Sequence, residues 1–511
     1  MSTNTLLFAA VAPQWVIDWL TPVWILGLGC IFGLLLVGLL WGIVWLLGLV
    51  WPRARQFGDE MPRLVTEGAM GPMLAVIAGL ALFGVSAFPL APAPEVMVKS
   101  IFRPQKGGTQ TVTVEVAPAP ADQEPEPIAV EVSFDGDELQ RIDFDSNEDV
   151  LLLVNQDGDK SSDRFTIEAG RPQVFAQNVL LANPFSGQYW DKLYAVNNGT
   201  APATLTMKIQ TGSPYPQMQT VWIAGLCIGA VFLFYLLLWA FTPRMSAVAF
   251  VTTKSEIAQP AFLLLTGGGA ALIFAFIWIP YFTFGEDIKV LKDSGLTTIM
   301  ICGIGLAVWA ATKSVSEEIE GRTALTVLSK PIQRRSFLIG KFVGIMWAVL
   351  LLFVLLGVVF MVCVAYKPIF DGREGATDAT WESCFEQMIS VVPGLVLAYL
   401  ETFVLAAISV AISTRLPMLA NFSLTFTIYL LGNLSPQIVQ SSEGRFAPVK
   451  FVAGLIATVF PVLDHFNIQA AIAGGQEVPN MYLVGALFYS LIYGGIALLV
   501  ALVFFEDRDL A

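Results

Sequence analysis

The chain contains 511 residues, of which 55% are hydrophobic and only 14% are charged, and its mean hydropathy is +0.68. This composition excludes a soluble protein of several domains and predicts a membrane protein with several spans. The net charge of −13 does not indicate a particular partner, because acidic residues are concentrated in residues 91–217 whereas a later segment is basic.

The five cysteines do not form the pattern of a disulfide framework. Four of them lie in apolar segments and only Cys384 lies in a polar one, so we predict no disulfide. The N-terminal residues 1–19 lack the basic start of a secretory signal peptide, so we expect this segment to be retained.

The N-terminal segment, residues 1–90, contains two predicted transmembrane helices. The apolar run Val23–Trp51 exceeds the roughly 20 residues that span a bilayer. This run holds two pairs of glycines four residues apart, Gly29 with Gly33 and Gly38 with Gly42. Such pairs allow another helix to approach closely, or they only reflect the frequency of glycine in membrane helices. The loop that follows contains the basic residues Arg53, Arg55 and Arg63 and is therefore predicted to be cytoplasmic. The N-terminus is then outside, and Gly71–Leu90 crosses the membrane outward.

Residues 91–217 differ in composition from the rest of the chain. After the proline-rich stretches PLAPAP and VAPAPADQEPEP, short segments alternate apolar and polar residues: TVTVEV, IAVEVSF, DVLLLVN, DRFTIEA and ATLTMKI. Alternation with period two, interrupted by turns, is typical of an antiparallel β-sandwich. We therefore predict an extracytoplasmic β-sandwich domain inserted between membrane helices.

Two acidic clusters lie in this domain. They contain Asp143, Asp145, Asn147 and Asp149, and then Asp157, Asp159 and Asp163. Oxygen ligands at alternating positions can bind calcium, but the glycine and final glutamate of an EF-hand loop are absent. The alternative is an ordinary solvated acidic face, and we predict no metal site.

Residues 218–246 form a third transmembrane helix, Met218–Phe241, and a cytoplasmic link. After a surface segment at Ala247–Gln259, six further spans are expected in residues 247–511, which gives about nine transmembrane helices in all, three and then six. These six are Ala261–Phe284, Leu296–Thr312, Phe342–Tyr366, Met388–Thr414, Leu416–Leu434 and Tyr482–Phe505. They leave a short external link at residues 285–295 and a polar loop at residues 367–387.

A charged segment, residues 313–341, interrupts these apolar runs. Its basic residues place it in the cytoplasm: Lys313, Arg322, Lys330, Arg334, Arg335 and Lys341. Gly321 and Pro331 are expected to end helices, with a short amphipathic turn between them.

The string EEIEGRTALTVLSKPIQRRSFLIGK, residues 317–341, resembles the cytoplasmic loop of ABC-2 type permeases, and the resemblance covers roughly residues 247–510. Such permeases are the membrane subunits of ATP-binding-cassette transporters. The resemblance implies a separate cytoplasmic ATPase subunit that binds ATP and Mg²⁺, and a second permease copy that is either identical or related.

The resemblance also implies which residues contact the ATPase. We expect the turn Arg322–Ser329 to be the main contact and Thr252–Gln259 to be the second. The expected ATPase-coupling residues are Glu317, Glu318, Glu320, Gly321, Arg322, Thr323, Leu325, Leu328, Ser329, Lys330 and Pro331. Membrane lipid headgroups are the expected partners of Arg334, Arg335 and Lys341.

Glu401 lies near the centre of a predicted span. A carboxylate at this depth is costly, so it is a candidate for the translocation pathway, and the alternative is a hydrogen bond between helices or a protonated carboxyl. The apolar stretch 449–463 is short for a span and fits a re-entrant or interfacial hairpin, which would leave the C-terminus in the cytoplasm. A full crossing there would place the C-terminus outside.

Several enzyme classes are excluded by missing motifs. Gly340-Lys341 is followed by Phe342, so the chain has no phosphate-binding P-loop, and neither a zinc protease nor a serine hydrolase motif occurs. We therefore predict no catalytic residues, no bound cofactor and no nucleic-acid partner. The predicted function is an exporting permease subunit in the cell (inner) membrane. Two alternatives stay open: a membrane scaffold whose ATPase-driven motion acts on the β-domain, or an ATP-independent transporter using Glu401.

Overall fold

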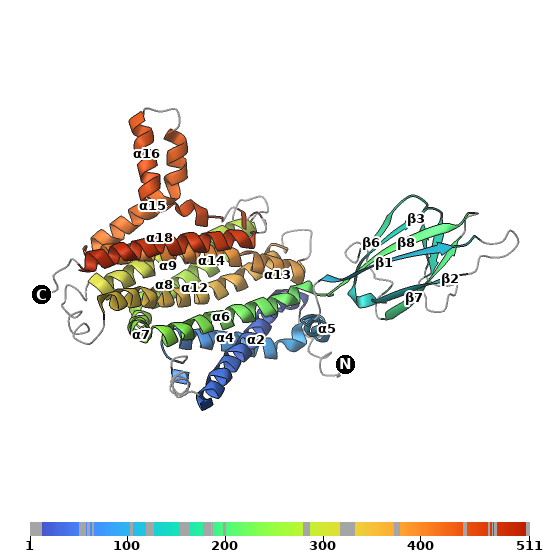
Figure 1. Ribbon diagram of the computed structural model, residues 1–511, viewed down its shortest axis with the longest axis horizontal. Helices are drawn as coiled ribbons and strands as arrows, with labels where there is room; N and C mark the ends of the chain where they lie inside the picture. Colours follow the sequence, from blue (N-terminus) through green and yellow to red (C-terminus); the bar gives the residue numbers. More distant parts are fainter. Residues whose placement is uncertain are drawn as a thin grey trace. The chain divides into compact units, whose positions relative to one another are not determined.

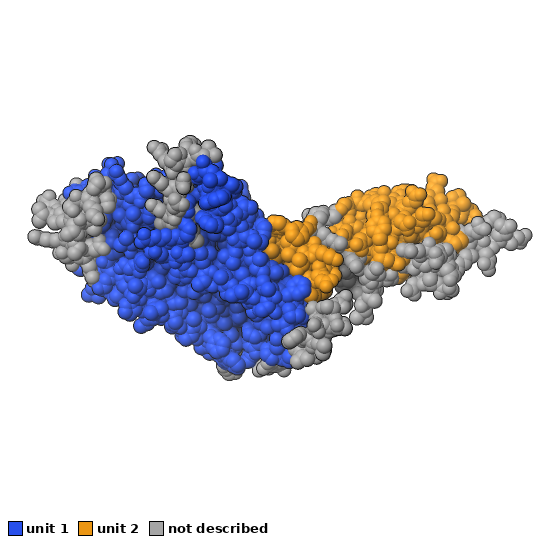
Figure 2. All heavy atoms as spheres, turned by 90° about the horizontal axis from the view of Figure 1, so that it is seen from below, with its two compact units in different colours: residues 1–92, 224–511 blue, residues 93–223 orange. Residues whose placement is uncertain are grey.

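The computed structural model describes residues 13–50, 58, 62–63, 66–102, 106–118, 127–153, 164–176, 185, 188–197, 201–279, 287–316, 333–372, 379–442, 447–468, 471–472, 474 and 478–506. The chain divides into two compact units, which Figure 2 colours separately. One unit comprises residues 1–92 and 224–511 and is helical, and the other comprises residues 93–223 and contains the strands.

The helical unit is a bundle of long helices. Its elements are α2 (Gln14–Val50), α4 (Met70–Ser86), α6 (Thr220–Phe241), α7 (Pro243–Ile257), α8 (Pro260–Trp278), α9 (Asp287–Ala311), η4 (Thr312–Ser316), α12 (Arg334–Gly372), α13 (Trp381–Ser390), α14 (Val392–Ser413), α15 (Met418–Ser442), α16 (Ala447–Val459), η5 (Leu463–Phe466) and α18 (Asn480–Glu506). Within it, α9 packs against α12 and α14, and α14 also packs against α18 (Figure 1).

Seven helical segments of the described chain are long and apolar enough to cross a membrane. They are Gln14–Leu49, Pro216–Phe241, Pro260–Trp278, Asp287–Ser316, Arg334–Gly372, Trp381–Ser413 and Asn480–Glu506. The prediction of a mainly helical membrane protein is therefore confirmed. The count of nine stays a prediction, because α4 has 17 residues and α15 contains many polar side chains.

Two connections that the sequence predicted as loops are partly helical. Residues 287–295 of the predicted external link form the first turns of α9, with Leu291 and Lys292 buried. The predicted polar loop 367–387 contains the end of α12 and most of α13, whose Cys384, Phe385 and Met388 share one buried face. Thr380 caps the start of helix α13, because its hydroxyl accepts a hydrogen bond from Ser383 N at 3.4 Å. Polar residues on the opposite face of each helix made both segments resemble loops in the sequence.

The second unit contains two four-stranded sheets, with strand orders β1-β8-β3-β6 and β2-β7-β4-β5 and antiparallel pairing throughout. The strands are β1 (Lys106–Val116), β2 (Ile128–Asp135), β3 (Leu139–Ser146), β4 (Val150–Leu153), β5 (Arg164–Ile167), β6 (Gln173–Ala176), β7 (Tyr189–Asn197) and β8 (Ala203–Gly212). Both sheets contribute to one apolar cluster, which includes Trp190 and Met207. The separate antiparallel β-domain is confirmed, and its description as a sandwich stays a prediction.

The first acidic cluster has partners inside this domain. Arg141 Nε donates a hydrogen bond to Asp143 Oδ1 at 2.6 Å, and Ala169 N donates to Asp149 Oδ1 at 2.8 Å. Asn147 Oδ1 accepts from Thr204 N at 2.6 Å. These contacts favour the acidic face over a calcium site. The second cluster, Asp157, Asp159 and Asp163, lies outside the described residues.

Candidate functional site

The predicted ATPase-coupling residues all lie outside the described residues. They are Glu317, Glu318, Glu320, Gly321, Arg322, Thr323, Leu325, Leu328, Ser329, Lys330 and Pro331. The structure does describe the two ends to which this coupling segment, residues 317–332, is attached. On one side α9 continues into the π-helical turn η4, which ends at Ser316, and on the other side α12 begins at Arg334.

Helix α7 lies between α6 and α8; we call it the elbow, and it has two distinct faces. Thr252, Thr253 and Glu256 are each buried, so these members of the predicted second contact face the bundle. Five exposed residues recur every three or four positions and form a stripe, with Ser255 exposed beside it: Arg244, Ala247, Val251, Lys254 and Ala258. Contact of Thr252–Gln259 with a partner stays a prediction, and within this range the exposed residues of the stripe are Lys254 and Ala258.

The buried face of α7 crosses α12 at two glycines. A Cβ added at Gly340 would lie 2.8 Å from Met245 O, and one added at Gly344 would lie 2.5 Å from Ala249 O. Thr253 Oγ1 donates to Gly344 O at 2.9 Å across the same contact. Small residues four apart let two helix backbones touch in this way. The G-x-x-x-G spacing at residues 340–344 is the sequence signal for this contact.

A chain of polar contacts connects this elbow to the attachment of the coupling segment. Trp309 Nε1 on α9 donates to Gln259 Oε1 at 2.6 Å, and Gln259 Nε2 donates to Glu256 Oε2 at 2.9 Å. The Lys313 ammonium lies 5.7 Å from the centre of the Trp309 ring. These contacts place Lys313, Trp309 and Gln259 in one connected series between η4 and α7.

The most connected polar residue in this region is Asn421, on α15, which is fully buried. Its Nδ2 donates to Thr312 Oγ1 and to Ser409 Oγ, both at 3.0 Å. Its Oδ1 accepts from Thr425 Oγ1 at 3.2 Å. We call Asn421, Thr312, Ser409 and Thr425 the Asn421 network. It joins η4 to α14 and α15 through hydrogen bonds in an apolar bundle, where such bonds have few alternatives.

Glu401 lies on α14, about two helical turns from Ser409, and is 2% exposed. Asn433 Nδ2 on α15 donates to Glu401 Oε1 at 3.3 Å. The carboxylate borders a cavity of about 70 Å³ that is also lined by polar side chains of α9, α15 and the segment after η5: Thr297, Tyr429, Asn433 and Asn467. A cavity of this size and polarity has room for a few water molecules.

The sequence identified Glu401 correctly as a buried membrane carboxylate, and the structure adds its surroundings. Glu401 Oε2 has no hydrogen-bond partner among the described residues, while its companion oxygen binds Asn433. Neither Asn433 nor Asn421 was singled out from the sequence, because nothing there indicates which helices pair.

The three predicted interface anchors occupy different environments. Arg334 donates to Glu506 O at 3.1 Å, and Arg335 is exposed and lies 3.6 Å from the Glu506 carboxylate. Lys341, in contrast, is only 7% exposed, and its ammonium lies 5.5 Å from the centre of the Phe337 ring. Contact with lipid headgroups therefore stays a prediction for the two arginines and does not suit the buried position of Lys341.

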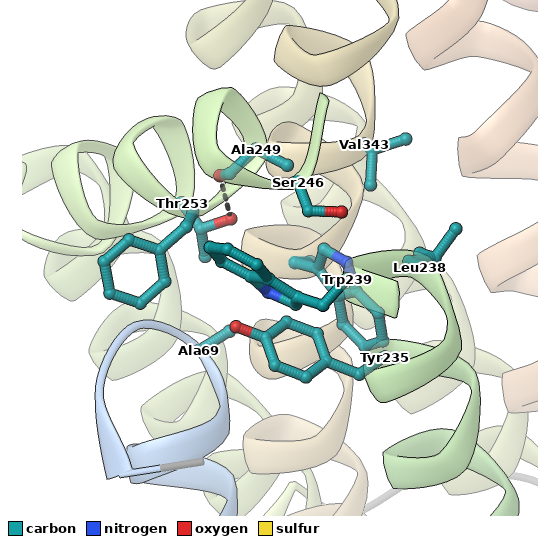
Figure 3. Close-up of a pocket in the computed structure, with 10 residues that line it drawn as sticks. Ala69, Tyr235, Leu238, Trp239, Ser246, Ala249, Thr253 and Val343 are labelled. Atoms are coloured by element: carbon teal, nitrogen blue, oxygen red, sulfur yellow. Dashed lines mark hydrogen bonds between the residues drawn. The ribbon is translucent and has the colours of Figure 1, made fainter. Parts of the chain in front are cut away.

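The N-terminal segment reaches the elbow at Glu67–Ala69. Glu67 lies 3.3 Å from Lys254 Nζ and 3.1 Å from Arg63 Nε. Gly68 has a φ of +68° and lies against Phe250, and Ala69 borders a small gap between α6, α7 and α12 (Figure 3). The hydrogen bond from Lys254, followed by that from Arg63, lowers the pKa of Glu67 from its ordinary value.

We expect Glu67→Gln to have only a small effect on stability, because the ion pair is exposed and screened. A lowered folded-state pKa means that the contribution is present above the ordinary carboxyl pKa and is lost as the pH falls through the lowered value. Thermal unfolding of the variant should differ slightly from that of the parent at neutral pH and not at all in strong acid. A large loss of Tm at neutral pH would show that the contact matters more than its exposure indicates.

One comparison with known proteins identifies the family of the chain. The family model described as "ABC-2 family transporter protein" matches residues 205–510, which is more than half of the chain. A search of curated proteins finds no match. Membership of this family implies an ATP-binding-cassette subunit as the partner. The chain belongs to the ABC-2 family of transporter proteins and is a multi-pass membrane protein of the permease type.

Proposed function

We propose that the chain is the membrane permease of an ABC-2 exporter and is driven by a separate cytoplasmic ATPase bound at residues 313–341. The observation that carries this proposal is the Asn421 network. It connects the turn η4, from which the coupling segment emerges, to the two helices that hold Glu401 and Asn433. ATP and Mg²⁺ bind to the partner, since this chain has no P-loop.

In this mechanism the coupling segment transmits motion of the ATPase to the membrane helices. ATP-driven closure of the ATPase displaces the segment, and the displacement reaches η4 because the chain is continuous at Ser316. Thr312 then moves relative to Asn421, so the packing of α15 against α14 changes. The Glu401 cavity lies between these helices, and its exposure to water alternates with the nucleotide state.

The proposed topology follows the sequence prediction. The N-terminus and the β-domain are extracytoplasmic, the β-domain is a sandwich, and the C-terminus is cytoplasmic after nine crossings. Helix α16 supports this count because its 13 residues are fewer than the roughly 20 that a span requires. Two permease copies, identical or related, complete the pathway.

One observation favours the ATP-independent alternative. The uncompensated oxygen of Glu401 beside a polar cavity is an arrangement that a proton- or ion-coupled transporter also uses. The two functions differ in what opens the cavity, which is ATP in the first case and an ion gradient in the second. The scaffold alternative predicts that the cavity stays closed in every nucleotide state.

Access to the cavity can be measured with a single cysteine. We expect Thr297→Cys, in a chain without its native cysteines and in complex with the ATPase, to react with a water-soluble maleimide much faster in one nucleotide state. The rate follows the population of the open state, so a change of about tenfold or more is expected. Ser490→Cys is the matched control, since Ser490 is fully buried on α18 away from the cavity. Equal labelling of Thr297→Cys with and without ATP would contradict the proposed mechanism.

A further inference from the structure

The cavity beside Glu401 is bordered by two side chains that each keep one acceptor oxygen without a donor. Glu401 Oε1 accepts from Asn433 Nδ2, but Oε2 accepts from no described residue although the side chain is only 2% exposed. Asn433 Nδ2 also donates to Tyr429 O at 3.1 Å, and Asn433 Oδ1 accepts no hydrogen bond in the described part of the chain. A buried carboxylate oxygen without a partner costs free energy unless a bound group satisfies it.

The charge of Glu401 is also unbalanced within the described chain. No lysine or arginine among the described residues forms an ion pair with its carboxylate. The buried base of α9, Lys292, does not border the cavity, and the charge that it interacts with is Glu386. An ionised carboxylate inside a membrane protein is stable only beside a compensating positive charge. The cavity therefore favours a cation over an anion or a neutral ligand.

The other polar side chains around the cavity carry neutral oxygens. Thr297 of α9 and Tyr429 of α15 have hydroxyl groups, and Asn433 and Asn467 have amide oxygens. Carboxylate and carbonyl oxygens are the ligands that hard cations prefer. Asn467 follows η5 in non-helical backbone, and membrane proteins use such backbone beside their ion sites. The chemistry of this ligand set is that of a hard metal ion.

The number of carboxylates indicates the charge of the ion. Glu401 is the only carboxylate among the described residues that line the cavity. Calcium sites usually contain several carboxylates, and no group of three or more His, Cys, Asp or Glu side chains suits a metal ion in the described chain. One negative charge balances one positive charge, so a divalent ion would leave a net charge buried. A volume of about 70 Å³ accommodates a monovalent ion together with water.

We propose that the cavity binds one monovalent metal ion, such as Na⁺, through the Glu401 carboxylate and the oxygens of Asn433, Tyr429 and Thr297. These ligands belong to α9, α14 and α15, so the bound ion stabilises the packing of the three helices. Sequence patterns do not reveal such a site, because three of the four ligands are neutral. The ion occupies the same cavity as the proposed function uses, but its binding does not require the ATPase, so either proposal can fail without the other.

Equilibrium binding of radioactive Na⁺ tests the site. The purified full-length chain in detergent, without ATPase or nucleotide, is incubated overnight with the label in a buffer whose other cation is N-methyl-D-glucamine. The chain is then captured on beads and counted. Local openings of proteins take microseconds to seconds, so this incubation gives the ion time to reach a buried cavity. We expect one bound ion per chain, displaced by an excess of unlabelled Na⁺.

Three variants separate the site from general ion binding. Glu401→Gln keeps the size of the side chain but removes its charge, and we expect bound label to fall by about tenfold or more. Asp18→Asn is the matched control, because Asp18 is also a buried carboxylate of a membrane helix, is 6% exposed and does not border the cavity. Asn433→Asp adds a second carboxylate, so Ca²⁺ should displace the label at a concentration roughly tenfold or more below that needed with the parent chain.

Three results would overturn the proposal. The first is the absence of bound label in the parent chain, which would leave water or a protonated Glu401 in the cavity. The second is unchanged binding in Glu401→Gln or, where that variant fails to fold, unchanged displacement by Ca²⁺ in Asn433→Asp. The third is displacement of the label from the parent chain by less Ca²⁺ than unlabelled Na⁺, which would identify a divalent site. ATP-dependent labelling of Thr297→Cys tests the proposed function separately.

Discussion

Gly344→Leu is expected to prevent α7 from packing on α12 and to abolish recovery of folded protein. The leucine Cβ alone would lie 2.5 Å from Ala249 O and 2.7 Å from Thr252 Cβ, so the helices must separate. Overpacking of cores usually costs about 1–3 kcal/mol, and we expect about 3 kcal/mol or more where the obstructing atom is backbone. The separation also breaks the bond from Thr253 to Gly344 O.

Size-exclusion profiles of the solubilised protein and its resistance to denaturant measure this effect. Gly268→Leu is the matched control, because nothing lies within 4 Å of a Cβ added at Gly268 on α8. The control should be recovered like the parent chain. Recovery of a stable, monodisperse Gly344→Leu protein would contradict the close crossing of α7 and α12.

Asn421→Leu is expected to destabilise the protein less than Gly344→Leu does, and it should also impair the ATP-dependent opening of the Glu401 cavity. It leaves Thr312, Ser409 and Thr425 without their buried partner, which costs about 1–3 kcal/mol in general. Because Thr312 belongs to η4, we also expect the ATP-dependent labelling of Thr297→Cys to be lost while the ATPase still binds. Retention of that labelling would show that motion reaches the cavity by another route.

A double-mutant cycle measures the contact itself. Thr312→Val, Asn421→Leu and the double variant should be non-additive by about 0.6–1.7 kcal/mol, the range for hydrogen bonds between membrane helices. Asn421→Leu combined with Ser490→Ala should be additive, since Ser490 bonds to Leu487 O of its own helix. Additive effects of Thr312→Val and Asn421→Leu would show that Thr312 is not coupled to Asn421.

Bilayer thickness explains why the sequence predicted the long helices well. A run such as that in α12 or α18 must be apolar over its whole length, and composition alone reveals it. Helix α13 and the start of α9 were missed because they are amphipathic and hold polar residues on one face. In the β-domain, five strands lie in the short segments predicted from the sequence: β1, β2, β4, β5 and β8. Strands β3, β6 and β7 were overlooked because charged or aromatic residues interrupt the alternation.

The candidate site was predictable in part for similar reasons. Glu401 stands out because a carboxylate in an apolar run is costly wherever the helix packs. Asn421 and Asn433 do not stand out, since their importance depends on contacts with α9 and α14 that only the fold provides. The predicted second contact, Thr252–Gln259, stays a prediction: the fold shows that Thr252 and Glu256 are buried and that Lys254 and Ala258 are exposed, and the sequence did not distinguish these two faces.

Recovery of the partner tests the central claim most directly. We expect affinity purification of the tagged full-length chain from membranes to recover an ATP-binding-cassette ATPase. Leu325→Asp should abolish that recovery, whereas Val174→Asp, which adds the same charge to an exposed position on β6, should not. Absence of any such ATPase from the purified parent chain, or its undiminished recovery with Leu325→Asp, would contradict the account of an ATPase-driven permease.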